Sequence, residues 1–405
     1  MPAPLRIGSG DSEPPQPPGL PPWQPLALGF RPFFLLAGLS ALVLMIVWLL
    51  VWDRGGGGPL DYYGPVDWHA HEMLFGFGTA VIAGFLLTAV RNWTGMHTPA
   101  GLPLALLALV WLGGRILPGC AGCPVLLGAA VDWAFLPLLA LALARPLWQG
   151  RNRSNRWFLV LLAAMALANG LVHAQALGWT TATAARGIAV MLTLTLILLV
   201  FVGGRIMPFF TESALAGSRP VTRRWVELSG LSLLGVVALV QAVGLSGPVP
   251  ALLLAAAGLV QLVRLAGWYD KRVLQVPLLW VLYTGYLWLV LGLLLLAAGE
   301  LGAFPRSGAR HALTIGAIGV FMLGMMARVA LGHTGRTLAP ARAIVVAFVF
   351  ANLAAVARVF GPVVYPAGYS GWIMASGVLW VIAFALFTAV YTPILLRRRA
   401  DGRPG

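Results

Sequence analysis

Charged side chains are scarce in this sequence. Its 405 residues include 27 Lys and Arg and 12 Asp and Glu, so 10% of the chain is charged while 60% is hydrophobic. Soluble domains carry about 25% charged residues, because charge keeps a folded surface in contact with water. The shortage excludes an ordinary soluble domain and predicts a protein solvated largely by lipid.

Motifs for several common chemistries are also missing. The sequence contains no phosphate-binding Gly-rich loop with Lys, no nucleophile elbow and no zinc-protease helix motif, which argues against an ATP-driven pump or a hydrolase. Only two cysteines occur, Cys120 and Cys123, and Pro124 stands where a c-type haem site needs His. A loop disulfide, two idle thiols and a redox role remain open for this pair.

Long apolar runs separated by short polar breaks fill most of the chain. A helix needs about 20 such residues to cross a hydrocarbon core of about 30 Å. The runs lie near residues 33–52, 71–90, 102–118, 124–147, 157–178, 186–208, 226–245, 249–267, 277–299, 310–332, 343–360 and 371–396. The short run at 102–118 and the Pro that ends 186–208 leave eleven or thirteen helices as alternatives to twelve.

These runs predict an all-α polytopic membrane protein with about twelve transmembrane helices. A single transmembrane domain would span residues 26–396, after a disordered Pro-rich tail at 1–25 and before a basic tail at 397–405. With the N-terminus inside, the inner loops and tails hold most Lys and Arg residues, which predicts that both termini are cytoplasmic. The net charge of +15 then reflects Lys and Arg residues on the cytoplasmic side of a lipid bilayer, and no nucleic-acid partner is needed to explain it.

Two predicted helices repeat each other at an offset of 240 residues. The first reads His71, Gly76, Gly84 and Thr94-Gly95, and the second reads His311, Gly316, Gly324 and Thr334-Gly335. The sixth helix has a related spacing, since Arg205 precedes Thr211 by the interval that separates Arg328 from Thr334. These helices are the second, sixth and tenth, which indicates a threefold pseudo-repeat of four-helix units.

Histidines are the main candidates for chemistry. Ionisable groups at membrane depth are costly and usually functional, and neutral imidazole binds iron and copper. His69, His71, His173 and His311 fall at a similar depth near the predicted outer face. His333 ends the tenth helix about 33 Å away and is a candidate for a second, inner site. Polar anchoring at the interface is the plainer alternative for any one of them.

Repeat symmetry predicts how the outer histidines pair. His71 and His311 occupy equivalent positions and would hold a planar macrocycle between them, as the axial pair of a haem. The side chain of His69 points about 200° around the helix from His71, at 3.6 residues per turn. His69 is therefore the candidate, together with His173, for a second metal such as copper.

Four charged residues complete the predicted sites. Glu72 adjoins His71 and is a candidate for proton transfer or for orienting an imidazole; stabilisation of a helix start is the alternative. Arg91, Arg205 and Arg328 lie at inner helix ends and are candidate contacts for anionic groups such as propionates. Snorkelling toward the membrane surface is the alternative for these arginines.

The sequence resembles the NnrS family over nearly the whole chain after residue 26. The matching stretches are Gly29-Phe-Arg-Pro-Phe-Phe34, Trp68-His-Ala-His-Glu-Met73, Ala83-Gly-Phe-Leu-Leu-Thr88, Asn92-Trp-Thr-Gly95, Gly203-Gly-Arg-Ile-Met-Pro208, Arg264-Leu-Ala-Gly-Trp268, His311-Ala-Leu-Thr-Ile-Gly316 and Gly332-His-Thr-Gly335. Glu212-Ser213 departs from the Arg-Asn-like pair expected there. The resemblance implies a bacterial inner-membrane protein with haem b and copper that acts in nitric oxide metabolism, denitrification and nitrosative-stress defence.

Residue by residue, the resemblance implies His69, His71, His311 and His333 as metal-site candidates, with His173 a weaker match. A more distant architectural similarity is to haem-copper oxidases, although this chain lacks the histidines that these oxidases carry on helices six and seven. The first functional hypothesis is a haem and copper protein that binds or reduces nitric oxide, as an oxidoreductase like nitric oxide reductase with an unknown electron donor.

Two alternatives use the same histidines. One is a metal or proton-coupled transporter, and the other is a nitric oxide or metal sensor without turnover. An alternating-access site lies near the membrane midplane, so the concentration of histidines toward one face weighs against the transporter.

Overall fold

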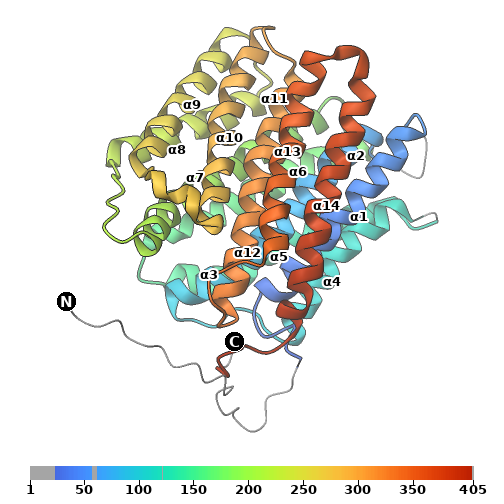
Figure 1. Cartoon of the computed structure of the whole chain (residues 1–405). Helices are drawn as coiled ribbons and strands as arrows, with labels where there is room; N and C mark the ends of the chain where they lie inside the picture. The colour runs from blue at the N-terminus through green and yellow to red at the C-terminus, as the bar shows by residue number, and fades with distance from the viewer. Residues whose placement is uncertain (1–22, 57–61, 121, 404–405) are drawn as a thin grey trace.

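Helices make up the architecture of the chain (Figure 1), for which a computed structural model describes residues 23–56, 62–120 and 122–403. Within these residues, twelve helices are long and apolar enough to cross a membrane, which confirms the predicted fold class. The spans are α1 (Phe30–Asp53), α2 with η1 and α3 (Pro65–Thr94), α4 with η2 (Leu102–Gly119), α5 (Val125–Gln149), η3 with α6 (Arg153–Ala176), α7 (Ala184–Ala214), α8 (Arg224–Ala242), α9 (Pro248–Trp268), α10 (Pro277–Glu300), α11 with η5 and α12 (Arg306–His333), α13 (Arg342–Val364) and η6 with α14 (Pro366–Leu396).

The second span begins earlier than the apolar run predicts. It starts at Pro65 instead of residue 71, so His69 and His71 lie inside the helix and do not open it. Proline suits the first helical turn, where its missing N–H costs nothing. The polar residues Asp67, His69 and His71 hid this turn from a search for apolar runs.

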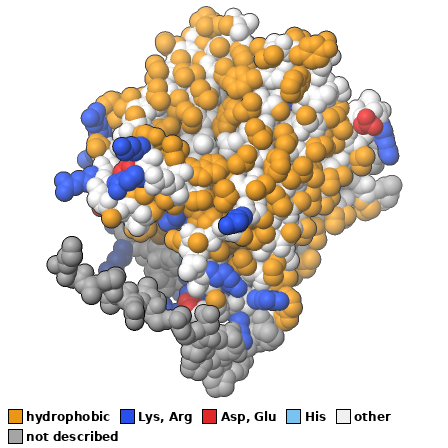
Figure 2. All heavy atoms as spheres, viewed as in Figure 1, with side chains coloured by type: hydrophobic (Ala, Val, Ile, Leu, Met, Phe, Trp, Pro, Cys, Tyr) orange, Lys and Arg blue, Asp and Glu red, His pale blue; other side chains and the backbone are white. Residues whose placement is uncertain are grey.

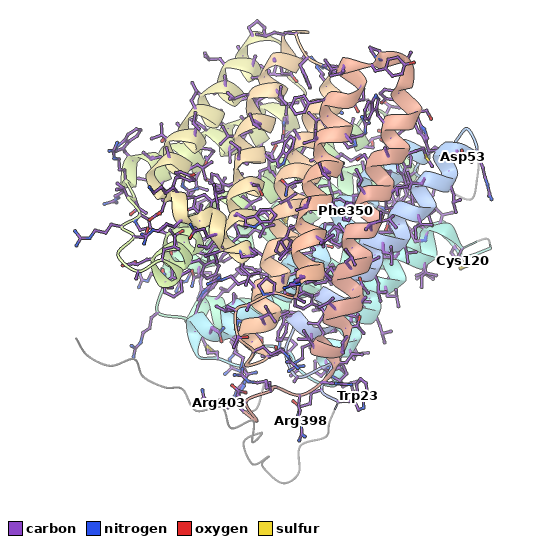
Figure 3. All side chains as sticks on the ribbon, viewed as in Figure 1. Trp23, Asp53, Cys120, Phe350, Arg398 and Arg403 are labelled. Carbon is purple, nitrogen blue, oxygen red and sulfur yellow. A yellow bond between two sulfur atoms is a disulfide. The ribbon has the colours of Figure 1, made fainter. Side chains whose placement is uncertain are left out.

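Both described chain ends meet at one end of the bundle. Trp23 forms an isolated antiparallel bridge with Arg397, and the amide of Gln24 donates to the carbonyl of Leu396 at 2.8 Å. Figure 3 shows Trp23, Arg398 and Arg403 at this end, with Asp53 and Cys120 away from it. The even number of spans follows from this arrangement. Most of the predicted N-terminal tail, residues 1–22, lies outside the described residues.

The surface of the bundle is largely apolar. Figure 2 shows hydrophobic side chains over most of the visible face, interrupted by few Lys and Arg side chains. Leucines at positions 141, 167 and 252 are about 70% exposed: Leu141 69%, Leu167 70% and Leu252 72%. Exposed apolar surface on this scale is unfavourable in water, and acyl chains solvate it.

The second and tenth spans form the centre of the bundle. In each, 89% of the most apolar stretch is buried, compared with 22% for the peripheral span Leu102–Gly119. Between them lies α7, which contacts both η1 and η5, while α3 contacts α12. The predicted repeat helices two, six and ten therefore meet one another, as a shared central axis requires.

A π-helical segment interrupts each of the two central spans. The segments are η1 (Glu72–Gly78) and η5 (Ala312–Val320), and their first residues lie 240 positions apart, as in the sequence repeat. Both spans also end at a left-handed glycine, Gly95 and Gly335, each with a φ of 70°. Such segments are rare and occur often at functional sites. The agreement supports the repeat of these two spans; α7 is continuous from Ala184 to Ala214, and threefold symmetry stays a prediction.

Candidate metal centre

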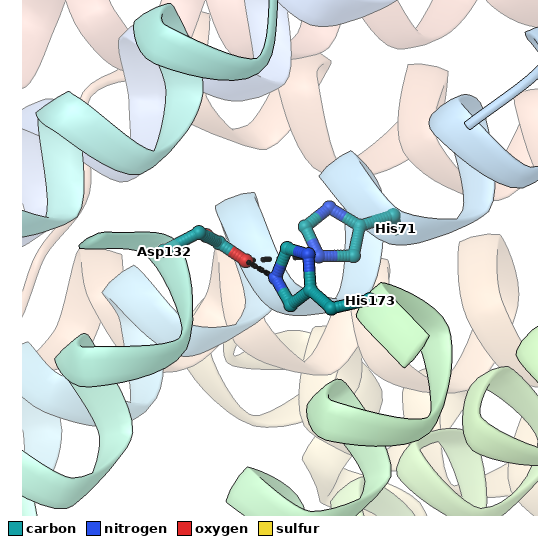
Figure 4. A group of neighbouring side chains, drawn as sticks. All are labelled: His71, Asp132 and His173. Carbon is teal, nitrogen blue, oxygen red and sulfur yellow. Dashed lines mark hydrogen bonds and ion pairs between the residues drawn. The ribbon is translucent and has the colours of Figure 1, made fainter. Parts of the chain in front are cut away.

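Two histidines and an aspartate from three different spans meet inside the bundle (Figure 4). His71 ends α2, Asp132 belongs to α5 and His173 to α6, and their exposed fractions are 0%, 3% and 4%. One ligand atom from each lies within 4.8 Å of the others. In the described part of the chain, no other group of three His, Cys, Asp or Glu side chains meets this description. We call these residues the His–Asp–His group.

Both imidazole rings turn one nitrogen toward the same carboxylate oxygen. Asp132 Oδ2 lies 2.8 Å from His173 Nε2 and 3.1 Å from His71 Nε2. The amide of Asn169 donates to the same oxygen at 3.0 Å. The three side chains therefore present two nitrogen atoms and one oxygen atom to a common centre, which is the ligand number of an open catalytic metal site.

The opposite nitrogens of the rings are held by further polar side chains. His71 Nδ1 lies 3.1 Å from Glu72 Oε1, and His173 Nδ1 lies 2.9 Å from the hydroxyl of Tyr62. Metal-ligating histidines usually make such a contact, because it fixes the orientation and basicity of the ring. This contact places Glu72 where it could orient the imidazole of His71, and its role stays a prediction.

The charges around the His–Asp–His group are balanced only if one more positive charge is present. Arg115 of α4 forms ion pairs with both Glu72, at 2.7 Å from Nε to Oε2, and Asp132. Two carboxylates and one guanidinium leave one negative charge if both imidazoles are neutral. An unpaired charge buried in this way is costly. Either a proton on His71, whose two nitrogens face carboxylates, or a metal cation neutralises it.

A glycine contact brings α4 and α5 close enough to form these ion pairs. A Cβ placed on Gly114 would lie 2.9 Å from the Asp132 Cα, a distance that real Cβ atoms do not show. We expect Gly114→Ala to push α4 away from α5, and to lower both metal content and thermal stability. Gly235→Ala is the control, because nothing lies within 4 Å of its Cβ. Metal analysis and unfolding temperature check this; equal values for the two variants would contradict it.

A separate cavity of about 310 Å³ lies between the second and tenth spans. His69 and His311 both line it, and we call it the central cavity. Its apolar wall includes Met45, Trp48, Met73, Phe77, Ile315 and Trp380. Small-molecule and cofactor sites commonly measure about 300–1,000 Å³ with a largely apolar lining and few polar groups. The central cavity falls at the lower end of that range.

Local contacts fix both rings in this cavity. The ring of His69 stacks on that of Trp48, with centroids 4.3 Å apart. His311 Nδ1 donates to the carbonyl of Ser307 at 2.7 Å, so its Nε2 is left to accept a bond or bind a metal. Arg310 and Arg358 also line the cavity and supply positive charge.

The structure groups the four outer histidines differently from the predicted pairs. His71 is placed with His173 and not with His311, and His69 shares the central cavity with His311. His69 and His71 do point to different sites, as their spacing predicts. The partners are reversed because the face of the second span that carries His69 turns toward the tenth span, while His71 faces α5 and α6.

The three predicted arginines lie elsewhere. Arg205 donates to the side chain of Asn155 in η3, and the guanidinium of Arg328 lies 3.7 Å from the ring centroid of Phe210. Arg91 lies in the last turn of α3. None of them lines the central cavity, where Arg310 and Arg358 stand instead. Their contacts fit the structural alternative better than anion binding.

The remaining candidates lie away from both sites. His333 packs against the ring of Phe30, with centroids 5.7 Å apart, and its carbonyl accepts a hydrogen bond from Arg399. His333 belongs to no group of three potential ligands among the residues that the structure describes. Cys120 and Cys123 are joined by a disulfide in the loop before α5, which excludes two idle thiols.

Several residues of the site were not predicted. Asp132 and Arg115 each place a charge inside an apolar run, and such charges usually mark a functional site. That signal could have singled them out from the sequence. Tyr62, Tyr63 and Asn169 give no such signal, because their roles depend on packing between separate spans.

The chain matches one known family. The family model described as NnrS protein matches residues 24–399, which is nearly the whole chain. No curated protein matches the chain.

Proposed function

We propose that this chain, which belongs to the NnrS family, holds copper at the His–Asp–His group and haem in the central cavity, and binds or reduces nitric oxide. The family and the buried ligand group fit a metal-binding membrane protein. One observation carries the proposal: three ligand atoms from buried His71, Asp132 and His173 lie within 4.8 Å of one another. When bound, the two groups would supply one-electron chemistry and a position for a diatomic ligand.

The His–Asp–His group fits a copper or similar transition-metal ion. Imidazole nitrogen with a carboxylate oxygen suits such metals, and Glu72 and Tyr62 hold the far side of each ring. The local negative charge favours a cation over an empty site. A bound metal cation would neutralise this charge in place of a proton on His71.

The central cavity fits a flat apolar group with acidic substituents. His69 and His311 come from different spans, both line the cavity, and would be the residues that hold the iron. The apolar wall excludes water, and Arg310 and Arg358 could pair with carboxylates at the cavity edge. Nitric oxide is small and uncharged, so we expect it to cross the lipid and enter an apolar cavity of this kind. Glu72 on the second span and Asp132 on α5 are buried acidic groups, and could hold protons for a reduction that uses an unidentified donor.

We further propose the bacterial inner membrane as the location, with both termini cytoplasmic. The distribution of Lys and Arg supports this orientation. Both sites then lie toward the outer face, since the second span starts at the end opposite the termini. An electron donor outside the cytoplasm would approach that face.

Metal analysis of the purified protein tests the central claim. We expect wild type to carry copper, His173→Ala to lose it, and His97→Ala to retain it, because His97 is exposed in a loop. Optical absorption of the same samples reports haem. Equal copper in all three proteins, or none in wild type after loading, would overturn the assignment of this group.

Anaerobic exposure to nitric oxide separates the functional alternatives. A redox enzyme supplied with a reductant is expected to consume nitric oxide continuously, beyond one equivalent per protein. A sensor would take up a stoichiometric amount and then stop. Uptake by neither route would contradict a role in nitric oxide chemistry while leaving the metal assignment in place.

A further inference from the structure

A polar pocket of about 220 Å³ lies beside the His–Asp–His group. Its wall includes Tyr62, Tyr63, Asp67 and Gln175, and we call it the tyrosine pocket. These four residues are half-buried, so solvent reaches them. At about 30 Å³ for each water, the pocket has room for several waters around an ion.

One layer of side chains separates this pocket from the ligands. The Tyr62 hydroxyl lies 2.9 Å from His173 Nδ1, and the Tyr63 ring stacks on that of His71 with centroids 4.5 Å apart. Both tyrosines also line the pocket. The two tyrosines therefore form a direct connection between the pocket and both imidazole ligands.

Asp67 supplies negative charge in the pocket wall. It lies in the first turn of α2, and no cation or hydrogen-bond donor pairs with it among the residues the structure describes. A carboxylate without a partner in a recessed wall raises the local concentration of cations. Arg115 presents a guanidinium to Asp132 and Glu72 and does not line the pocket, so a metal ion that enters through the pocket meets Asp67 as its charged wall residue.

We propose that the tyrosine pocket is the port through which a hydrated metal cation reaches the His–Asp–His group from the end opposite the termini, with Asp67 as the capture residue. This inference rests on the proposed function, because the port needs the metal group as its destination. The inference specifies the face of the protein from which the metal enters and the residue that sets the rate of metal uptake. Asp67 would act on the rate of exchange in both directions and leave the final occupancy unchanged.

The test measures how fast demetallated full-length protein takes up Cu²⁺. Protein in nanodiscs is mixed with Cu²⁺, passed through a desalting column at timed intervals and assayed for bound copper. We expect Asp67→Asn to slow loading by about tenfold, in line with the effect of electrostatic attraction on association rates. Asp67→Lys should slow it further, with the same final copper content in both variants.

Asp53→Asn is the matched control, because Asp53 is an exposed carboxylate at the end of α1 and lies outside the pocket. It should load at the wild-type rate. In sealed proteoliposomes, Cu²⁺ added on one side should load only the molecules whose pocket faces that side. Equal rates for wild type and both Asp67 variants, or loading from the end that carries the termini, would overturn the port and leave the site intact. A wild type that never takes up copper would instead remove the site itself.

Discussion

Replacing Arg115 with Met is expected to destabilise the metal-free protein by about 3–5 kcal/mol, the cost of leaving a buried ion pair without one partner. Arg115 is the only cation that forms ion pairs with Glu72 and Asp132 among the described residues, apart from histidine. Without it, two buried carboxylates face each other with at most a protonated His71 between them. Thermal unfolding in detergent measures the loss.

Metal should restore much of this stability. A divalent cation at the His–Asp–His group adds the positive charge that Arg115→Met removes, so metal is expected to raise the unfolding temperature more in the variant than in wild type. Arg186→Met is the control, since Arg186 is exposed at the start of α7. An identical metal-dependent shift in Arg115→Met and wild type would show that the two charges do not compensate each other.

Optical spectra of four histidine variants should separate into two classes. His69→Ala and His311→Ala are expected to lose the haem Soret band or shift it strongly, because both residues line the central cavity. His71→Ala and His173→Ala are expected to keep the band and lose copper, because they belong to the other group. Absorption spectra and metal analysis of the same preparations provide both readouts.

The two classes distinguish the structural grouping from the pairing predicted by repeat symmetry. If His71→Ala and His311→Ala lost the haem band while His69→Ala kept it, the symmetric pair would be right and the grouping in the structure would be wrong for the loaded protein. His97→Ala again serves as the control, because this exposed histidine touches neither site.

The number of spans could be predicted from the sequence, because the length of an apolar segment determines whether it can cross a bilayer. The repeat was also visible, since Gly95 and Gly335 each meet a left-handed backbone requirement that favours glycine. The start of the second span was missed because Asp67, His69 and His71 are polar residues in a helical turn. Apolar length cannot report such a turn.

The pairing of the histidines could not be read from the sequence for a different reason. Spacing along one helix gives relative directions, and it correctly separated His69 from His71. Which direction meets which neighbour depends on the positions of α5 and α6 around the second span. Asp132 shows the limit well: it is conspicuous as a lone carboxylate in an apolar run, but its histidine partners come from spans two and five.

One helix carries a residue of each site, only two positions apart. His69 faces the central cavity and His71 the His–Asp–His group, and the π-helical segment η1 begins at the next residue. We expect a ligand that moves one ring to shift the shared backbone that holds the other. Such coupling is reciprocal: if filling one site changes the affinity of the second by some factor, filling the second changes the first by the same factor. If both proposed sites are filled, we therefore expect the second span to couple their affinities.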